Sequence, residues 1–173
     1  GSDERLRFRI GSAEPVMTGP NEIFVTMDPA DTSPALSLFT INYNKVNVEI
    51  YRVQPGDWQA FLQYLRDYQR TDLQLRPPGE KVFDDAINIE APEDKLTEVY
   101  IPLEEYLVDG SGQFVVIAKP PKGLFEEDRY WQHVQVWVQV TGIGLDAFVD
   151  HSEMVVWATD LLTGAPVADL EIR

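Results

Sequence analysis

The sequence contains no cysteine among its 173 residues. Because disulfides, thiolate nucleophiles, zinc fingers and thiolate-bound clusters all need a cysteine sulfur, this one absence excludes all four. No stretch of about 18 consecutive apolar residues occurs, so the sequence predicts no direct insertion into a membrane. The first residues also lack the positively charged segment and apolar segment of a secretory signal.

Positive charge is scarce, with 14 Lys+Arg against 29 Asp+Glu and a formal net charge of -15. A chain of this charge is repelled by phosphate backbones, which argues against a nucleic-acid partner. A hydrophobic content of 44% and an aromatic content of 11% are too high for a disordered acidic tail. The length predicts one full domain and part of a second. Gly1 and Ser2 look like the remainder of a cleaved tag, so we expect the chain to come from a longer protein.

The dominant hydrophobic pattern has a period of two, as in Val134, Val136, Val138 and Val140. Such alternation is typical of a strand with one face in a core. Similar segments bounded by Gly, Pro, Asn and Asp are 6–10, 23–27, 36–41, 46–53, 81–89, 96–101, 113–119, 145–149, 154–159 and 167–172. Many short strands with intervening turns predict an all-β, antiparallel, immunoglobulin-like β-sandwich.

One segment, 57–69, has the period of a helix instead. Its apolar residues include Trp58, Phe61, Leu62 and Leu65, which follow the i, i+3, i+4, i+7 spacing of one buried helical face. We therefore predict a single amphipathic helix inserted into the sandwich and packed on a sheet through these four side chains.

A domain joint is predicted at Gly142 and Gly144, which interrupt an otherwise long strand-like run. A strand that leaves one sandwich and enters the next needs a bend, and glycine permits it at low cost. We expect residues 5–141 to form a complete domain and residues 142–173 to form the N-terminal strands of a second, truncated one. Too few strands remain there to close a sandwich, and unpaired edges would invite self-association with another copy.

No catalytic, cofactor-binding or metal-binding set emerges from the sequence. His133 and His151 are too far apart for a zinc motif. Adjacent carboxylates such as Asp84–Asp85 point to opposite faces of a strand, so they cannot converge on one substrate. The acidic residues in 28–31 could offer oxygens to calcium but do not match the spacing of a calcium loop. We predict that the chain is not an enzyme and needs no cofactor.

The tryptophans leave a second function open. Trp137 faces away from the even-numbered valines of its strand, so its row is either covered by another element, such as the helix, or exposed as a binding surface. Exposed, coplanar indoles of Trp131, Trp137 and Trp157 would indicate a ligand-binding, carbohydrate-binding or adhesion module of a secreted protein. Buried indoles would argue against it.

Two longer motifs resemble a known family. The run WVQVTGIGLDAFVD at 137–150, with 155–167 and its L-TG-PV turn, resembles the joint between successive macroglobulin-type β-sandwich domains of bacterial alpha-2-macroglobulins. Residues 46–53, followed by Asp57 and Trp58, are also similar to these proteins, as is the stretch 102–116.

The resemblance implies a non-catalytic structural module of a large bacterial protease inhibitor. Such proteins are secreted or periplasmic and often membrane-tethered, and their partners would be neighbouring domains of the parent chain and target proteases. They trap a protease when it cleaves a bait region, and many then couple it to an internal thioester built from Cys-x-x-Gln. Because this chain has no cysteine, the bait and any thioester are expected outside it.

Overall fold

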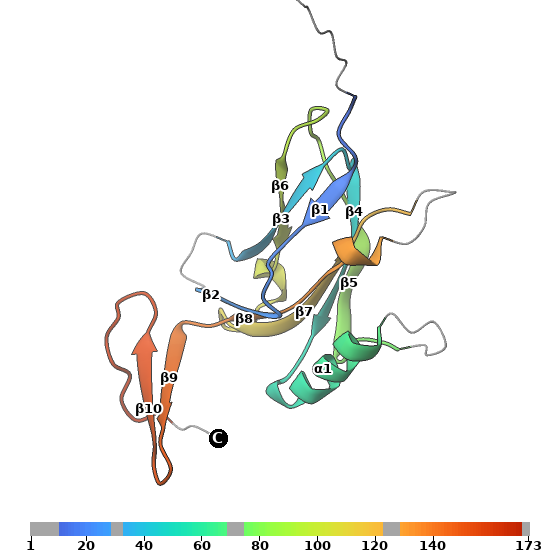
Figure 1. The fold of residues 1–173 in the computed structure, drawn as a ribbon. Helices are drawn as coiled ribbons and strands as arrows, with labels where there is room; N and C mark the ends of the chain where they lie inside the picture. The colour runs from blue at the N-terminus through green and yellow to red at the C-terminus, as the bar shows by residue number, and fades with distance from the viewer. Residues whose placement is uncertain (1–10, 29–32, 69–74, 123–128, 171–173) are drawn as a thin grey trace, which may run out of the picture.

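The computed structural model describes residues 11–28, 33–68, 75–122 and 129–170. These residues form a body of two β-sheets and one α-helix, from which a two-stranded ribbon projects (Figure 1). The strands are β1 (Val16–Thr18), β2 (Phe24–Met27), β3 (Ala35–Ile41), β4 (Lys45–Arg52), β5 (Glu80–Asn88), β6 (Thr97–Pro102), β7 (Gly112–Lys119), β8 (Val134–Val140), β9 (Ile143–Val149) and β10 (Met154–Asp160). The helices are η1 (Pro55–Asp57), α1 (Trp58–Asp67), η2 (Glu104–Tyr106) and η3 (Tyr130–Gln132). The predicted all-β class with one inserted helix is confirmed.

The two sheets of the body pack face to face. One has the strand order β1-β3-β6 and the other the order β2-β8-β7-β4-β5. The period of two seen in the sequence brings one row of each strand into a shared core, because alternate side chains of a strand point to the same face. Its fully buried members include Leu36, Leu38, Val46, Val48, Ile50, Ile101, Phe114, Val116, Val136 and Val138.

One pairing departs from the antiparallel prediction. β2 runs parallel to β8, with Phe24 opposite Trp137 and Met27 opposite Val140. A parallel pair needs a long connection between its strands, and β3 to β7 lie between β2 and β8 in the sequence. Alternation within a strand carries no information about the direction of its neighbour, so the sequence pattern could not reveal this arrangement.

The helix α1 covers the other face of the five-stranded sheet. On this face, Trp137 and Val115 form a second core with Phe61 of the helix, and Trp58 and Leu65 pack against it while partly exposed. The ring of Trp137 lies 5.3 Å from that of Trp58 and 5.7 Å from that of Phe61, measured between centroids. The row of Trp137 is therefore covered by the helix. Within the described residues, no helix is long and apolar enough to cross a membrane.

The side of α1 that packs on the second core includes Tyr64 and lacks Leu62, unlike the predicted one. Leu62 is half-buried and lies outside the second core, whereas Tyr64 belongs to it and is only 7% exposed. Positions 61, 64, 65 and 68 follow one helical line, while the residue after Phe61 points about 100° away around the axis. Residue 69, the predicted end, lies outside the described residues.

One predicted strand is not tested by the structure and another differs from it. Segment 6–10 lies outside the described residues. In segment 167–172, the described part, 167–170, contains no strand, and Pro166 instead forms an isolated bridge with Thr159. Because proline lacks an N–H group, a continuous ladder cannot run through this position.

Strand β1 was not predicted, because it has only three residues. It pairs antiparallel with β3, and side chains also tie it to η3. The buried amide of Gln132 accepts hydrogen bonds from the N–H of Met17 (3.2 Å) and the hydroxyl of Tyr43 (2.8 Å). The same amide donates to the carbonyl of Pro15 at 3.3 Å, to which Arg129 also donates at 2.8 Å. These bonds connect β1 to η3, over more than a hundred residues of sequence.

Candidate interaction surface

The ribbon leaves the body at a bend between β8 and β9. Gly142 lies at the bend, and its carbonyl accepts a hydrogen bond from the N–H of Leu161 at 2.9 Å. Thr141 donates its N–H to the carbonyl of Met27 at 3.0 Å, and its hydroxyl accepts from the N–H of Ile143 at 3.2 Å. Hydrogen bonds of Thr141 and Gly142 therefore fix the path of the chain where it leaves the body and enters the ribbon.

Gly144 is needed for close packing rather than for an unusual backbone. Neither Gly142 nor Gly144 has a positive φ. A Cβ atom at Gly144 would lie 2.8 Å from Cδ2 of Leu161 and 3.2 Å from the hydroxyl oxygen of Thr159. A larger residue at this position would therefore have to displace the end of the exposed Leu161 side chain.

The β9–β10 ribbon has apolar residues on both faces. Residues paired across the strands lie on the same face, and the register places Val149 opposite Met154 and Phe148 opposite Val155. The aliphatic face consists of Ile143, Leu145, Ala147, Val149, Met154, Val156 and Ala158, with Asp160 at its end opposite Ile143. The aromatic face consists of Gly144, Asp146, Phe148, Val155, Trp157 and Thr159.

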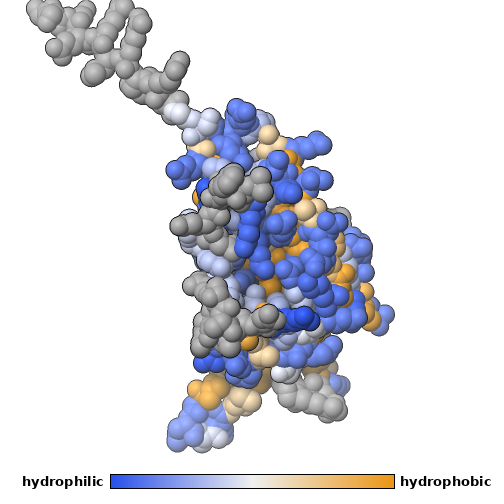
Figure 2. All heavy atoms as spheres, turned by 90° about the vertical axis from the view of Figure 1, so that its right-hand side faces the viewer, coloured by the Kyte–Doolittle hydropathy of each residue, from blue (hydrophilic) through white to orange (hydrophobic). Residues whose placement is uncertain are grey.

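Both faces are open to solvent. Leu145 on the aliphatic face is 56% exposed, and Phe148 and Trp157 on the aromatic face are 68% and 53% exposed. Figure 2 shows apolar residues beside the hydrophilic tip of the ribbon, at the lower end of the molecule. A two-stranded ribbon is marginally stable by itself, and an exposed apolar patch of this kind marks an interaction surface.

The ribbon segment is also uniformly acidic. Residues 142–170 contain five Asp and Glu side chains and no Lys or Arg. Asp146 lies within the aromatic face, opposite Trp157. The surface is therefore apolar with negative charge, which favours a partner that carries positive charge.

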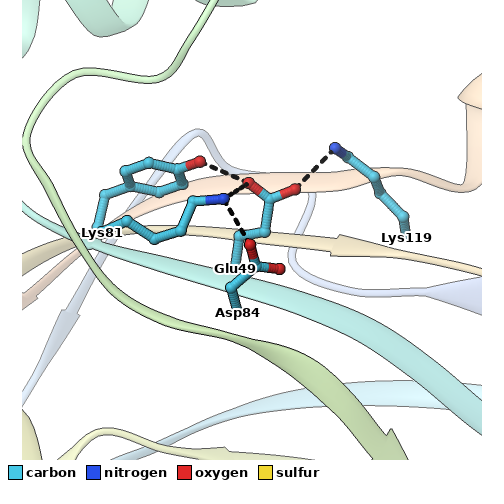
Figure 3. Close-up of polar contacts among 5 residues, drawn as sticks. Glu49, Lys81, Asp84 and Lys119 are labelled. Carbon is cyan, nitrogen blue, oxygen red and sulfur yellow. Dashed lines mark hydrogen bonds and ion pairs between the residues drawn. The ribbon is translucent and has the colours of Figure 1, made fainter.

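A second feature is a group of charged and polar side chains around Glu49, here called the Glu49 cluster (Figure 3). It comprises Glu49, Tyr51, Lys81, Asp84 and Lys119 and lies on the helix side of the five-stranded sheet. The carboxylate of Glu49 accepts a hydrogen bond from the hydroxyl of Tyr51 and lies 3.2 Å from the ammonium groups of both Lys81 and Lys119. Lys81 also donates to Asp84 at 2.7 Å. Glu49, Tyr51, Lys81 and Lys119 line a pocket of about 540 Å³.

The cluster changes the acidity of its members. Burial raises the pKa of Glu49, but the hydrogen bond from Tyr51 and the charge of Lys119 outweigh it, so the pKa lies below its ordinary value. Burial and the neighbouring Glu49 raise the pKa of Tyr51 to about 12. The hydrogen bond to Asp84 raises the pKa of Lys81. All charges are mutually satisfied, which is typical of a structural ion network.

The histidines and tryptophans do not gather into one site. His133 packs against Tyr130, with ring centroids 5.2 Å apart, and His151 lies exposed at the tip of the ribbon. Trp131 is 75% exposed on η3, and Trp157 is exposed on the ribbon. In the parts of the chain that the structure describes, no three His, Asp or Glu side chains are placed to hold a metal ion.

Comparison with known families decides the identity of the fold. A sequence model described as the bacterial alpha-2 macroglobulin MG2 domain matches residues 26–128, more than half of the chain. The chain belongs to this family. Gly142, Gly144 and the ribbon follow the matched range of this macroglobulin domain. A search of curated proteins finds no match.

Solved structures of Escherichia coli alpha-2-macroglobulin have a similar fold. The crystal structure spanning domains MG0-NIE-MG1 matches 90% of this chain with a TM-score of 0.59 at 14% identity. The one spanning NIE-MG1 matches 88% of this chain and 73% of its own, with a TM-score of 0.59 at 16% identity. The cryo-EM structure of the native conformation matches 90% at 14% identity, with a TM-score of 0.58. The chain spans 48% of the length of the first of these structures and 10% of that of the last.

The Glu49 cluster predicts how this macroglobulin domain responds to acid. Because the pKa of Glu49 in the folded state lies below its ordinary value of 4.5, its stabilising contribution is present above about pH 4.5. It is lost as the pH falls through the folded-state pKa. We expect the free energy of unfolding of Glu49→Gln to depend less on pH than that of the wild type between pH 5 and pH 3, as measured by urea unfolding.

Asp94 offers a matched control for this measurement, because it is a fully exposed carboxylate whose pKa is lowered by a hydrogen bond from Asn42 outside the cluster. Asp94→Asn should leave the contribution of Glu49 in place. Equal pH slopes for wild type and Glu49→Gln would show that the cluster does not lower the pKa of Glu49 in the folded state.

Proposed function

We propose that the chain is a non-catalytic structural module of a larger bacterial alpha-2-macroglobulin-type protease inhibitor. Residues 5–141 form one macroglobulin-type domain, and residues 142–173 supply the N-terminal strands of the next. The observation that carries this proposal is the β9–β10 ribbon, which is apolar on two exposed faces.

The contrast between body and ribbon supports the domain boundary. In the body, two cores are closed, one between the sheets and one beneath α1. In the ribbon, alternate residues such as Leu145 and Val149 have the composition of a core face but remain exposed. A sheet of this composition becomes stable when a second layer covers it, and in a multidomain protein the next part of the chain supplies that layer.

The module would hold geometry in the inhibitor. The bonds of Thr141 and Gly142 tie the ribbon to the end of β8, so the two domains would move as connected rigid bodies when a protease cleaves a bait region elsewhere in the parent. Its partners are then neighbouring domains of the parent and, through the whole protein, target proteases. The parent would act in the periplasm or outside the cell.

The carbohydrate-binding alternative receives less support. Trp137 is buried beneath α1, and the two well-exposed indoles, Trp131 and Trp157, lie on η3 and on the ribbon. A stacking platform needs exposed rings on one surface, and the covered indole of Trp137 cannot contribute to one.

A trapping assay on the intact parent tests the proposal. After addition of a broad-specificity protease, we expect cleavage of a small peptide substrate to continue and cleavage of a large protein substrate to stop, because a caged protease admits only small molecules. The parent variant Val156→Asp, which places a charge on the aliphatic face, should lose this discrimination.

Trp131→Ser changes an exposed residue of the body and should trap like the wild-type parent. If the wild-type parent leaves both substrates equally well cleaved, the inhibitor function is wrong, although the macroglobulin fold remains.

A further inference from the structure

The outer edge of β9 presents unpaired backbone groups. The bond from the N–H of Leu161 to the carbonyl of Gly142 fixes which residues of β9 bond to β10. In an antiparallel ladder these alternate, so the even-numbered residues face β10 and the N–H and C=O groups of Leu145, Ala147 and Val149 point away from it. These outward groups have no hydrogen-bond partner among the described residues.

The opposite edge of the ribbon is already partly occupied. After β10 the chain turns back, and the N–H of Asp160 donates to the carbonyl of Ala165 at 2.8 Å. The N–H of Val167 donates to the carbonyl of Ala158 at 2.9 Å. The longer open edge in the described part of the ribbon is therefore that of β9.

The edge strands of the body are protected against further pairing, and β9 is not. β1 and β2 have only three and four residues, and β6 ends in Pro102. β5 carries the charged residues Glu80, Lys81, Asp84 and Asp85. Short length, proline and charge are the usual devices that block strand addition. β9 has seven residues, a regular register, no proline and no lysine.

Charge indicates what kind of strand fits beside β9. Asp146 is the single charge on this strand, and the surrounding segment 142–170 is acidic throughout. A second copy would bring another acidic ribbon alongside, and like charges opposite each other in a sheet are destabilising. A strand with Lys or Arg near Asp146 and apolar residues at alternate positions would match both charge and faces.

We propose that the outer edge of β9 is a strand-addition site for a β-strand of alternating apolar and basic residues. The strand comes from another part of the parent protein, and this assignment of its source rests on the proposed function. Main-chain bonds to Leu145, Ala147 and Val149 supply the pairing, and a basic side chain near Asp146 supplies the selectivity.

The isolated chain can be tested with a short peptide of alternating valine and lysine. We expect the peptide to bind and to protect the amides of Leu145, Ala147 and Val149 from hydrogen exchange, as measured by NMR. Ala147→Pro removes an outward N–H without removing a β9–β10 bond, so it should weaken binding roughly tenfold.

Ala86→Pro is the matched control. The N–H of Ala86 on the edge strand β5 bonds to the carboxylate of Asp85 rather than to β4, so the same substitution there tests a protected edge. Binding of the valine-lysine peptide should be unchanged in this variant. A peptide of alternating valine and glutamate should bind the wild-type chain more weakly than its lysine counterpart.

Several outcomes would overturn the proposal. The first is that the valine-lysine peptide binds a folded Ala147→Pro variant as tightly as the wild type. The second is that the peptide protects amides outside β9 instead. The third is that the lysine and glutamate peptides bind equally tightly. Sedimentation that shows a dimer of the chain, abolished by Ala147→Pro without peptide, would identify a second copy as the occupant. The protection pattern in the wild-type chain needs no variant, and it is independent of whether the parent traps proteases.

Discussion

Replacing Phe61 by aspartate is expected to lower the free energy of unfolding by about 4 kcal/mol, a large part of the stability of a domain of this size. Phe61 is fully buried between α1 and the five-stranded sheet, next to Trp58 and Trp137. The substitution leaves a cavity in the second core and places a carboxylate there without a partner. Urea unfolding followed by circular dichroism measures the change.

Leu62→Asp introduces the same charge one position later in the same helix. Because Leu62 is only half-buried and lies outside the second core, the introduced carboxylate can reach water, and we expect a loss of about 1 kcal/mol or less. The sequence pattern, which places Leu62 on the packed face, would instead imply a large loss. Similar losses for the two variants would mean that α1 sits on the sheet in another rotation.

Trp137→Ala is the second substitution with a large expected effect, a loss of about 3–5 kcal/mol. The indole is 1% exposed and contacts the rings of Trp58 and Phe61, so its removal opens a cavity at the centre of the second core. The near-ultraviolet circular dichroism signal of the packed aromatic residues should fall together with the stability.

Trp131→Ala removes the same side chain from an exposed position on η3 and should change the stability by no more than about 0.5 kcal/mol. Comparing the two variants shows how much of the stability loss comes from burial of the indole rather than from loss of a tryptophan as such. An effect at Trp131 as large as that at Trp137 would indicate that the indole of Trp131 is packed in solution.

The sequence predicts those parts of the fold that local periodicity determines. Alternating valines predict β8 as a core strand, and the spacing of Trp58, Phe61, Leu62 and Leu65 predicts α1. Both patterns arise because one face of the strand or helix is buried against the rest of the body. The burial of Tyr64 was missed, because tyrosine counts as polar in such a pattern although this ring is buried.

Features that depend on distant residues were not predictable. The side chain of Gln132 bonds to Pro15 and Met17, more than a hundred residues earlier in the chain. β2 acquires its parallel direction only from β8. The open edge of β9 was also hidden, because it is defined by backbone groups that point away from a neighbour. The apolar composition of 143–160 suggested a surface that needs cover, but not which edge was free.

The path of the chain through the joint has a mechanical consequence. β8 is bonded along both sides, to β2 and to β7, and it continues through Thr141 and Gly142 into β9. Tension applied by whatever holds the ribbon would pull β8 along its own axis and load two ladders in shear at once. Many hydrogen bonds would then have to break together, so β8 would act as an anchor that resists extension while the Gly142 bend yields first.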